Sequence, residues 1–432
     1  MVAAIPPSKL VELQQLCSTA DVELTVLGTF ANHGRLILRW FGEVVCDMPM
    51  DFMHGGVPQP CRSAIASAAP QNATQWPLLV DHTLLLPRIL GHPSVASKEW
   101  VVRQYDHEVQ GGTVLKPYQG EHGHGPGDGS VVKPRLDLPQ GVAIGCGIYP
   151  RMAELDPYAA TANAIDEAIR NTVAAGGNPH RTAIIDNFCW GDCRKPDRFG
   201  SMVLAAEACR DAAIAYGTPF VSGKDSLNNE YRVHGEEKSI PPTLLCTAVS
   251  IVEDCERTVG TPLQKAGNHL VVVGITTNDG GGSVAADMFA LEDSRVPRPC
   301  FETAPSVFAA LHAAITQGCV AACHDLSEGG LAVAAAEMVI GSSGLGANID
   351  LARIPASDTV SAVARLYAET PTRFLVEVHA EQLEHFSGLF RTLPWAAVGV
   401  VQVGGQLELR NGTTPLLSLD SATLRSANCV QA

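Results

Sequence analysis

Strands that alternate with helices in the C-terminal part of the chain constrain its fold more than any other feature. Apolar runs predict strands at residues 270–275, 320–323, 374–378 and 397–401, and helical spacing predicts helices at residues 305–317, 327–340 and 380–391. Strands and helices in this order bury their apolar faces by stacking in layers. The pattern therefore predicts an α/β (α+β) unit over residues 266–432.

Two further units and a linker are expected before it. Residues 1–60 combine a helix at 8–19 with strands at 22–29 and 35–45, joined by a turn at 32–34. So few elements bury little by themselves, which is typical of the tail of a domain. Residues 61–83 are predicted to be a linker, and residues 84–260 a second α/β unit. A chain of 432 residues is long enough for two or three domains.

Composition excludes some classes of function. The formal net charge is −15 at pH 7, and such a charge repels polyanions, so nucleic acid is not an expected partner. The chain shows no early signal segment and no apolar run of about 18 residues, which predicts a cytoplasmic protein without a membrane span. The 13 cysteines lack the spacing of a zinc knuckle and are expected to be reduced.

Residues 218–230 hold the densest set of polar groups. The apolar residues 218–221 predict a short buried strand that breaks at Ser222 and Gly223 into a turn. Glycine lets backbone N–H groups approach an anion, Lys224 supplies a charge for phosphate, and Asp225 can hold a hard cation. These groups suit a nucleotide with its magnesium ion. An ordinary polar turn is the alternative, and companion residues elsewhere in the chain favour the nucleotide.

A helix is predicted from Asp156, with that residue as N-cap and a proline after it, to about residue 175. Asn163, Glu167 and Asn171 recur every fourth residue and share one face of this helix. Carboxylate and amide oxygens suit magnesium, whereas a solvated helix face is the alternative.

Three glycine-containing loops are further candidates. The loop at 120–129 presents Asp128, which can reach over phosphates and supply a second metal ligand. The loop at 323–331 places Asp325 beside Ser327, the expected N-cap of the following helix, whose free N–H groups would attract an anion. The loop at 278–283 is a candidate phosphate cradle. A capping turn and a flexible turn are the respective alternatives for the last two loops.

Three of these segments together resemble one enzyme family. They are Ser-Gly-Lys-Asp-Ser-Leu at residues 222–227, the helix with Glu167 and Asn171, and His-Asp-Leu-Ser-Glu-Gly-Gly-Leu at residues 324–331. In order and spacing they resemble formylglycinamide ribonucleotide amidotransferase, also called phosphoribosylformylglycinamidine synthase. The synthetase core of that family has two copies of an N-domain plus C-domain unit, shared with aminoimidazole ribonucleotide synthetase. Residues from about 84 onward resemble the second copy, and residues 8–60 resemble the tail of the first copy's C-domain.

The resemblance implies an ATP-dependent ligase of de novo purine biosynthesis. ATP phosphorylates the formamide oxygen of formylglycinamide ribonucleotide, and ammonia from glutamine then displaces the phosphate to give the amidine. Such catalysis rests on positioning and on Mg²⁺ that neutralises phosphate charge. Carried over by position, the resemblance implies three sets of site residues. The nucleotide contacts are Gly127, Asp186, Gly223, Lys224 and Ser327, and the Mg²⁺ ligands are Asp128, Glu167, Asn171 and Asp325. The substrate contact is Ser226.

No catalytic residue is assigned, because the family's catalytic histidine belongs to the N-domain of the first copy. The implied partners are a first half of the synthetase and a glutaminase, and the implied substrate is a small phosphorylated molecule. An apolar sheet face, expected where N-domains pair, also allows a homodimer. Two hypotheses follow. In the first, the chain is one part of a working ligase. In the second, it is a catalytically silent half that holds an auxiliary Mg-nucleotide (ATP or ADP).

Overall fold

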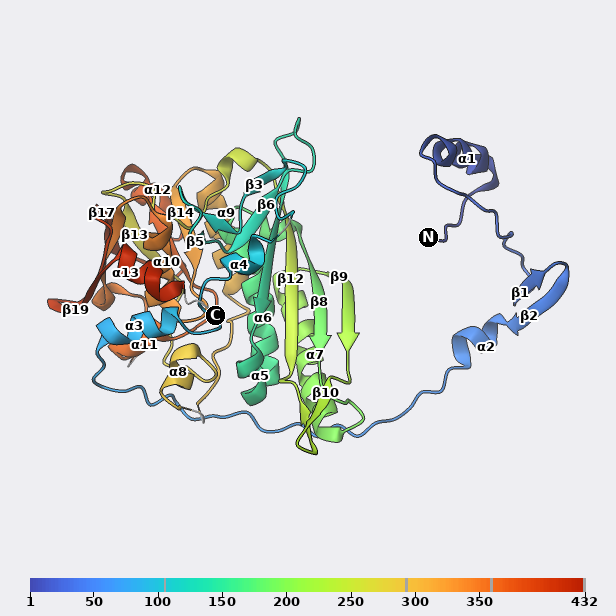
Figure 1. Ribbon diagram of the computed structural model, residues 1–432, viewed down its shortest axis with the longest axis horizontal. Coiled ribbons are helices and arrows are strands. Elements are labelled where there is room, and N and C mark those ends of the chain that lie inside the picture. Colours follow the sequence, from blue (N-terminus) through green and yellow to red (C-terminus); the bar gives the residue numbers. More distant parts are fainter. Residues whose placement is uncertain (105, 292–293, 358–359, 430–432) are drawn as a thin grey trace. The chain divides into compact units, whose positions relative to one another are not determined.

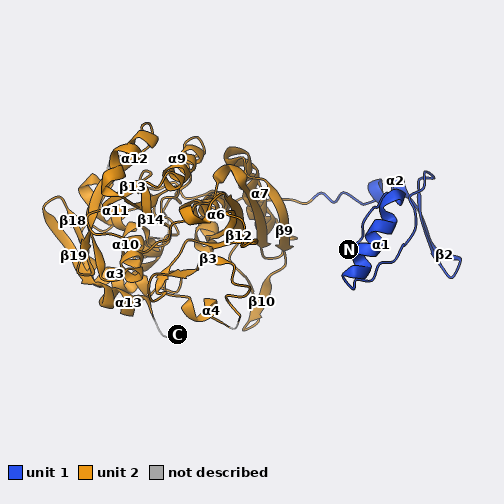
Figure 2. Ribbon diagram, turned by 90° about the horizontal axis from the view of Figure 1, so that it is seen from above, with its two compact units in different colours: residues 1–61 blue, residues 62–432 orange. Residues whose placement is uncertain are grey.

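The computed structural model describes residues 1–104, 106–291, 294–357 and 360–429, so the last residues of the predicted unit 266–432 lie outside the described part. The chain divides into two compact units, residues 1–61 and 62–432 (Figure 2). Among the helices that the structure describes, none combines the length and the apolar character that crossing a bilayer requires.

Unit 1 is a helix, a hairpin and a short second helix. Its elements are η1 Pro7–Lys9, α1 Leu10–Thr19, β1 Arg35–Trp40, β2 Glu43–Pro49 and α2 Met50–Gly55. The helix at 8–19 is confirmed, but the hairpin was wrongly placed. Its turn lies at Phe41 and Gly42, both with positive φ, as a two-residue hairpin turn requires, and residues 22–29 form no strand. None of these elements has a buried residue.

Unit 2 contains a six-stranded sheet in the order β3-β6-β7-β12-β8-β9. All its neighbouring strands are antiparallel except β8 and β9. Three helices, α5 Pro150–Leu155, α6 Pro157–Ala174 and α7 Pro196–Tyr216, accompany it (Figure 1). In chain order the strands are β3 Thr113–Leu115, β6 Gly129–Val132, β7 Gly141–Ile148, β8 Thr182–Cys189, β9 Phe220–Ser226 and β12 Thr243–Val252.

One face of this sheet is covered and the other is open. Burial alternates along β7 and β12, and every second residue is buried. Ile144 and Ile148 point to the other face and are each 38% exposed. This alternation confirms the expected open apolar face on the sheet that contains residues 143–148 and 244–251.

The second sheet of unit 2 has seven strands in the order β14-β16-β13-β17-β15-β18-β19. The alternation of strands and helices predicted for this region is confirmed. The strands are β13 His269–Val273, β14 Val320–Asp325, β15 Leu345–Asp350, β16 Phe374–Val378, β17 Trp395–Val403, β18 Gln406–Asn411 and β19 Thr414–Asp420. The helices around them are α8 Val284–Met288, α9 Ala304–Thr316, α10 Gly330–Gly341, α11 Ala362–Tyr367, α12 Leu383–Leu389 and α13 Ser421–Asn428.

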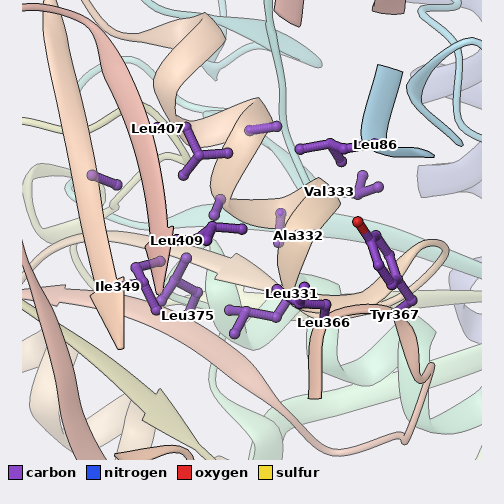
Figure 3. Close-up of a cluster of buried hydrophobic side chains, with 14 of the residues drawn as sticks. Leu86, Leu331, Ala332, Val333, Ile349, Leu366, Tyr367, Leu375, Leu407 and Leu409 are labelled. Atoms are coloured by element: carbon purple, nitrogen blue, oxygen red, sulfur yellow. The ribbon is translucent and has the colours of Figure 1, made fainter. Parts of the chain in front are cut away.

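Two large apolar clusters form most of the core of unit 2. One runs from the covered face of the six-stranded sheet through α6, α7 and α9 to one face of the seven-stranded sheet. The other lies beyond that sheet, where α10 packs among β18, α11 and α3 (His82–Leu90) (Figure 3). The smaller elements are α4 Glu99–Val102, β4 Tyr118–Gln119, β5 Gly125–Pro126, β10 Glu230–Val233 and β11 Glu236–Ser239. The layered α/β architecture thus places α6 between the two sheets.

The segment at 62–81 has no helix or strand but is fixed to unit 2. The indole N–H of Trp76 donates to Asn278 O (2.9 Å), and Gly280 N donates to Thr74 Oγ1 (2.8 Å). A Cβ at Gly280 would overlap the Trp76 ring. The loop at 278–283 therefore packs against this segment, and its glycines serve close packing; the phosphate-cradle alternative gains no support from these contacts.

Candidate functional site

Helix α6 positions the first set of candidate residues. Asp156 is its N-cap, as predicted, and its Oδ1 accepts from Ala159 N (3.0 Å). Glycines of β7 let the helix approach the sheet closely, since a Cβ at Gly147 would collide with the Ala164 carbonyl. Because α6 lies so close to β7, Glu167 Oε2 accepts from Ile148 N (3.0 Å), and Asn171 Nδ2 donates to Cys146 O (2.8 Å). The shared face is buried, which excludes the solvated-face alternative.

Asp128 and Asp325 meet although they lie far apart in the sequence. Asp325 N donates to Asp128 Oδ2 (3.0 Å), and His324 Nδ1 lies 2.7 Å from Asp128 Oδ1. The other ring nitrogen of His324 is 3.0 Å from Glu337 Oε2. Asp128, His324 and Asp325 offer ligand atoms within 4.8 Å of one another. Glu167 and Asn171 face the same region from α6, bonded to the β7 backbone.

Arg170 is the main buried cation of this region. It is fully buried, its Nε lies 3.0 Å from Asp325 Oδ2, and its Nη1 pairs with Asp166. Burial opposes ionisation of Asp325, but Arg170 and His324 overcome it and lower the pKa of that carboxyl. Asp325 is therefore ionised, as a metal ligand must be.

Carboxyl groups nevertheless outnumber basic groups in this region. Burial, reinforced by Glu328 and Asp325, raises the pKa of Glu167 well above its usual value. Burial also raises the pKa of Glu328 to about 7. Carboxylates resist ionisation together when no cation balances them. The carboxyl groups of the region, namely Asp128, Asp166, Glu167, Asp325, Glu328, Glu337 and Glu369, outnumber the basic groups, which are the buried Arg170, His324 and Arg373 and the more exposed Lys98.

The residues present fit a magnesium ion. Asn171 Oδ1 is a buried acceptor with no hydrogen-bond partner within the described ranges. Mg²⁺ takes oxygen ligands, and carboxylates with one amide oxygen are a suitable set. An added divalent cation would also relieve the repulsion that raises the pKa of Glu167 and Glu328. The fit rests on two observations: Asn171 Oδ1 has no hydrogen-bond partner in the described part of the chain, and the carboxyl groups of the region outnumber its basic groups.

Gly127 and Ser327, the candidate nucleotide contacts near Asp128 and Asp325, lie in closely packed loops. A Cβ at Gly127 would overlap the amide end of the buried Gln119 side chain, so the loop before Asp128 is closely packed there. The expectation that Ser327 caps the next helix is wrong. The N-cap of α10 is Gly329, with φ of 78°, and Gly330 also has positive φ. These two left-handed residues delay the helix, and Ser327 Oγ lies 3.3 Å from Asp325 Oδ1 instead.

The second set of candidates lies on β9. The prediction of a buried strand that ends at Ser222 is wrong, because the strand continues to Ser226 as an exposed edge, parallel to β8. Hydrogen bonding to β8 keeps the polar sequence extended. Gly223 pairs with Asp186, and a Cβ at Gly223 would collide with the Asp186 carboxylate. These two residues therefore share one face of the sheet.

Lys224 and Ser226 occupy the opposite, open face, since side chains alternate along a strand. The Lys224 ammonium contacts Ser226 Oγ, and Ser226 pairs in register with Cys189 of β8. Within the described residues, no hydrogen bond or ion pair joins the β9 group to the carboxylates around Asp325. The candidate residues thus form two groups, one between the sheets and one at the edge of the first sheet.

Sequence reasoning missed the buried Arg170 and Glu369, and the exposed Lys98 at the border of this region. Burial lowers the pKa of Lys98, against the attraction of Glu328 and Glu337. No local sequence motif around Lys98 predicts that it lies near these two carboxyl groups. Arg170 had a usable signal, because a lone arginine three residues after Glu167 on an alanine-rich helix needs a buried acidic partner.

Comparison with known proteins defines the class first. Residues 127–252 match the N-terminal domain of AIR synthase related proteins, and residues 265–411 match the C-terminal domain of the same class. The chain therefore contains both domains of that class in tandem, which agrees with its two sheets.

The particular relatives are subunits of one ligase. The chain is 33% identical over 389 residues to phosphoribosylformylglycinamidine synthase subunit PurL of Deinococcus radiodurans, covering 88% of this chain and 50% of the relative. It is 32% identical to the PurL subunit of Ignicoccus hospitalis, covering 95% and 55%, respectively. The chain is thus similar to PurL and spans about half the length of the curated relatives it matches.

Solved structures show the same fold. The T. maritima PurL complexed with ADP superposes with a TM-score of 0.61 at 20% identity, over 79% of this chain and 51% of that chain. A chain of the HypE–HypF complex superposes with a TM-score of 0.55 at 13% identity, over 75% of this chain and 97% of that chain. At these identities the comparison establishes the architecture alone.

Proposed function

We propose that this chain provides the second N-domain and C-domain pair of a phosphoribosylformylglycinamidine synthase. That enzyme converts formylglycinamide ribonucleotide to its amidine, with ATP and glutamine, in cytoplasmic purine biosynthesis. The observation that carries the proposal is the meeting of Asp128 and Asp325 beside Glu167 and Asn171, which fits a Mg-nucleotide. The similarity to PurL supports the same assignment.

Unit 1 supports the view that another C-domain precedes this pair. One constant offset in residue number superimposes β1 on β18, β2 on β19 and the start of α2 on that of α13. Both hairpins even have their register shift at the same place, after Leu38 and after Leu409. Unit 1 is therefore interpreted as the tail of a C-domain like that of unit 2.

The same offset explains why residues 24–32 form no strand. Their counterpart is β17, which in unit 2 pairs with β13 and β15. Gly399 of β17 lies so close to β15 that a Cβ would collide with Asn348, whereas its counterpart Gly28 has open space. In the proposal, the missing neighbours of this strand belong to the first half of the synthetase.

Each group of site residues then has a role. Asp128, Glu167, Asn171 and Asp325 hold Mg²⁺, which supplies neutralisation of phosphate charge. Gly127 and Ser327 lie next to these ligands in the sequence and contact the nucleotide. On the first sheet, Asp186, Gly223 and Lys224 contact nucleotide, and Ser226 contacts the ribonucleotide substrate. No catalytic residue is assigned to this chain.

The open face of the six-stranded sheet provides the surface for a partner. Its exposed residues Ile148 and Ile144 pair with Leu245 and Val249 of β12, and Ile251, opposite Val142, continues the apolar row. Such a face suits the equivalent sheet of another N-domain, either in the first half of the synthetase or in a second copy of this chain. A glutaminase is the further partner that the reaction requires.

A second candidate function is a structural half that holds an auxiliary Mg-nucleotide without turnover. The enclosed nature of the Asp128–Asp325 region favours it, because Arg170 and His324 already pair with these carboxylates. The separation of this region from Ser226 on the open face agrees with that view. In both functions the buried site binds Mg-nucleotide.

Activity measurements distinguish the two functions. Alone, the chain should not form the amidine from formylglycinamide ribonucleotide, ATP and ammonium ion. Addition of a separately produced first half should restore turnover, and Ser226→Ala should reduce that turnover while Ser418→Ala, an exposed serine of β19, should not. Turnover that is unaffected by Ser226→Ala would favour the structural half. Amidine synthesis by the isolated chain would contradict the whole assignment.

A further inference from the structure

The loop between α11 and β16, residues 368–373, is buried throughout and connects the elements around the candidate nucleotide site. Leu326 N, just after β14, donates to Arg373 O (3.0 Å). Thr372 reaches α6, where its N and Oγ1 donate to the two carboxylate oxygens of Asp166 (3.0 and 2.6 Å). The loop is therefore fixed to both layers that supply the site.

Glu369 in this loop binds two turns at once. Its Oε1 accepts from Gly329 N and from Val284 N, both at 2.8 Å. Gly329 belongs to the turn at 327–330 that carries Ser327, and Val284 begins α8 after the loop at 278–283. Glu369 is 3% exposed, so water does not replace these bonds. The Gly329 amide at the start of α10 is consequently occupied by protein.

Glu369 supplies the acceptor for the Gly329 amide from outside the turn. Gly329 is the N-cap of α10 but has no side chain to accept a hydrogen bond. Both Gly329 and Gly330 adopt left-handed backbone angles, and the Gly330 amide donates within the turn to Ser327 O (2.9 Å), whereas the Gly329 amide donates to Glu369. An amide left without an acceptor in a buried place costs about 1–3 kcal/mol.

The oxygen of Glu369 acts here as a neutral acceptor. Burial, with a contribution from Glu328, raises the pKa of Glu369 to about 8, although the hydrogen bonds from Gly329 and Val284 and the charge of Arg151 act to lower it. At neutral pH the carboxyl group is largely protonated. A glutamine side chain offers a carbonyl oxygen of the same geometry.

We propose that Glu369 is a positioning residue that holds Ser327 and Asp325 in place for the Mg-nucleotide, through its shared hydrogen bonds to Gly329 and Val284. This inference rests on the nucleotide site proposed above and adds a residue that does not touch the ligand. Removal of the acceptor should release the turn and weaken nucleotide affinity, while its replacement by glutamine should preserve both.

The chain contains a matched control for this test. Glu377 of β16 is also fully buried and also accepts from two backbone amides, those of Gln264 and Lys265 (2.7 and 2.9 Å), outside the proposed site. Mg·ADP affinity is measured by calorimetry on the full chain and on Glu369→Ala, Glu369→Gln and Glu377→Ala. Hydrogen exchange of the Gly329 and Val284 amides is measured on the same proteins without ligand.

We expect Glu369→Ala to weaken Mg·ADP binding about tenfold or more and to accelerate exchange at Gly329 and Val284. Glu369→Gln and Glu377→Ala should leave both readouts near those of the unmodified chain. Equal losses of affinity in the two alanine variants, or unchanged exchange at Gly329 in Glu369→Ala, would overturn the inference. Failure of the unmodified chain to bind Mg·ADP would overturn the proposed site, whereas the exchange data would still decide whether Glu369 holds the turn.

Discussion

Replacement of Arg170 by methionine tests the charge balance of the buried region. The guanidinium contacts Asp325 through Nε and Nη2, both at 3.0 Å, and pairs with Asp166. Methionine has a similar length and fills most of the space without a charge. Asp166 keeps other donors, among them Tyr216 Oη at 2.7 Å and Thr372 Oγ1 at 2.6 Å. Asp325 is therefore the carboxylate that is most affected by the loss of the guanidinium.

The expected magnitude follows from burial. Arg170 is fully buried and the Asp325 side chain is 3% exposed, and removal of one partner from such a pair costs about 3–5 kcal/mol. The pair of Arg135 and Asp137 is the control, since its side chains are 67% and 65% exposed. An exposed pair of this kind contributes at most about 1 kcal/mol. Mg²⁺ should recover part of the loss in Arg170→Met, because it supplies a cation to Asp325.

Urea denaturation followed by tryptophan fluorescence measures both effects. Trp190 is fully buried in the apolar cluster that includes α6, so it reports on the unfolding of this region. Arg170→Met should lower the unfolding midpoint clearly, Arg135→Met should not, and MgCl₂ should narrow the difference. A loss of less than about 1 kcal/mol in Arg170→Met would refute the claim that the buried ion pair between Arg170 and Asp325 stabilises this region.

Three further predictions concern pH, packing and assembly. The pKa of Glu328 is raised to about 7 in the folded state, so this group favours folding only while it is protonated, and the stability of the chain should fall between about pH 4.5 and pH 7. A thermal denaturation series over pH measures this fall, and MgCl₂ should reduce it. A stability that does not change with pH in the absence of Mg²⁺ would contradict this prediction. Gly280→Ala should displace Trp76 and red-shift the fluorescence, whereas Gly388→Ala, with open space around it, should not. Ile144→Lys on the open sheet face should prevent self-association seen by light scattering, and a stable monomer of the unmodified chain at micromolar concentration would argue against this interface.

Local signals in the sequence were sufficient for several parts of the fold. Asp156 followed by proline marks the start of α6, because a cap and a fixed φ act within a few residues. The order of strands and helices after residue 266 also follows from local periodicity. The face of α6 with Glu167 and Asn171 was predictable for the same reason, although its burial was not.

Other parts depend on contacts that no local pattern contains. Strand β9 stays extended through polar residues because β8 pairs with it, and Ser327 fails to cap α10 because two glycines and Glu369 shape the turn. Arg170 and His324 become important only when the two sheets enclose them. Tertiary contacts therefore decided the details of the site.

The hairpin of unit 1 had a signal that was overlooked. Its turn at Phe41 and Gly42 matches, at a constant offset, the turn after β18, and Leu36 and Leu38 match Leu407 and Leu409. Comparison of the two ends of the chain with each other would have placed the strands correctly.

Calorimetric titration of the full chain with ADP tests the central claim most directly. Binding should require Mg²⁺, because the surplus of buried carboxylates would otherwise repel the phosphates. Asp325→Asn and Glu167→Gln should each weaken Mg·ADP binding, because each replaces a negatively charged oxygen ligand of the cation by a neutral amide oxygen, and Glu43→Gln on the exposed strand β2 should not. Binding that persists without Mg²⁺, or affinity that is unchanged in both site variants, would contradict the assignment of this region as a Mg-nucleotide site.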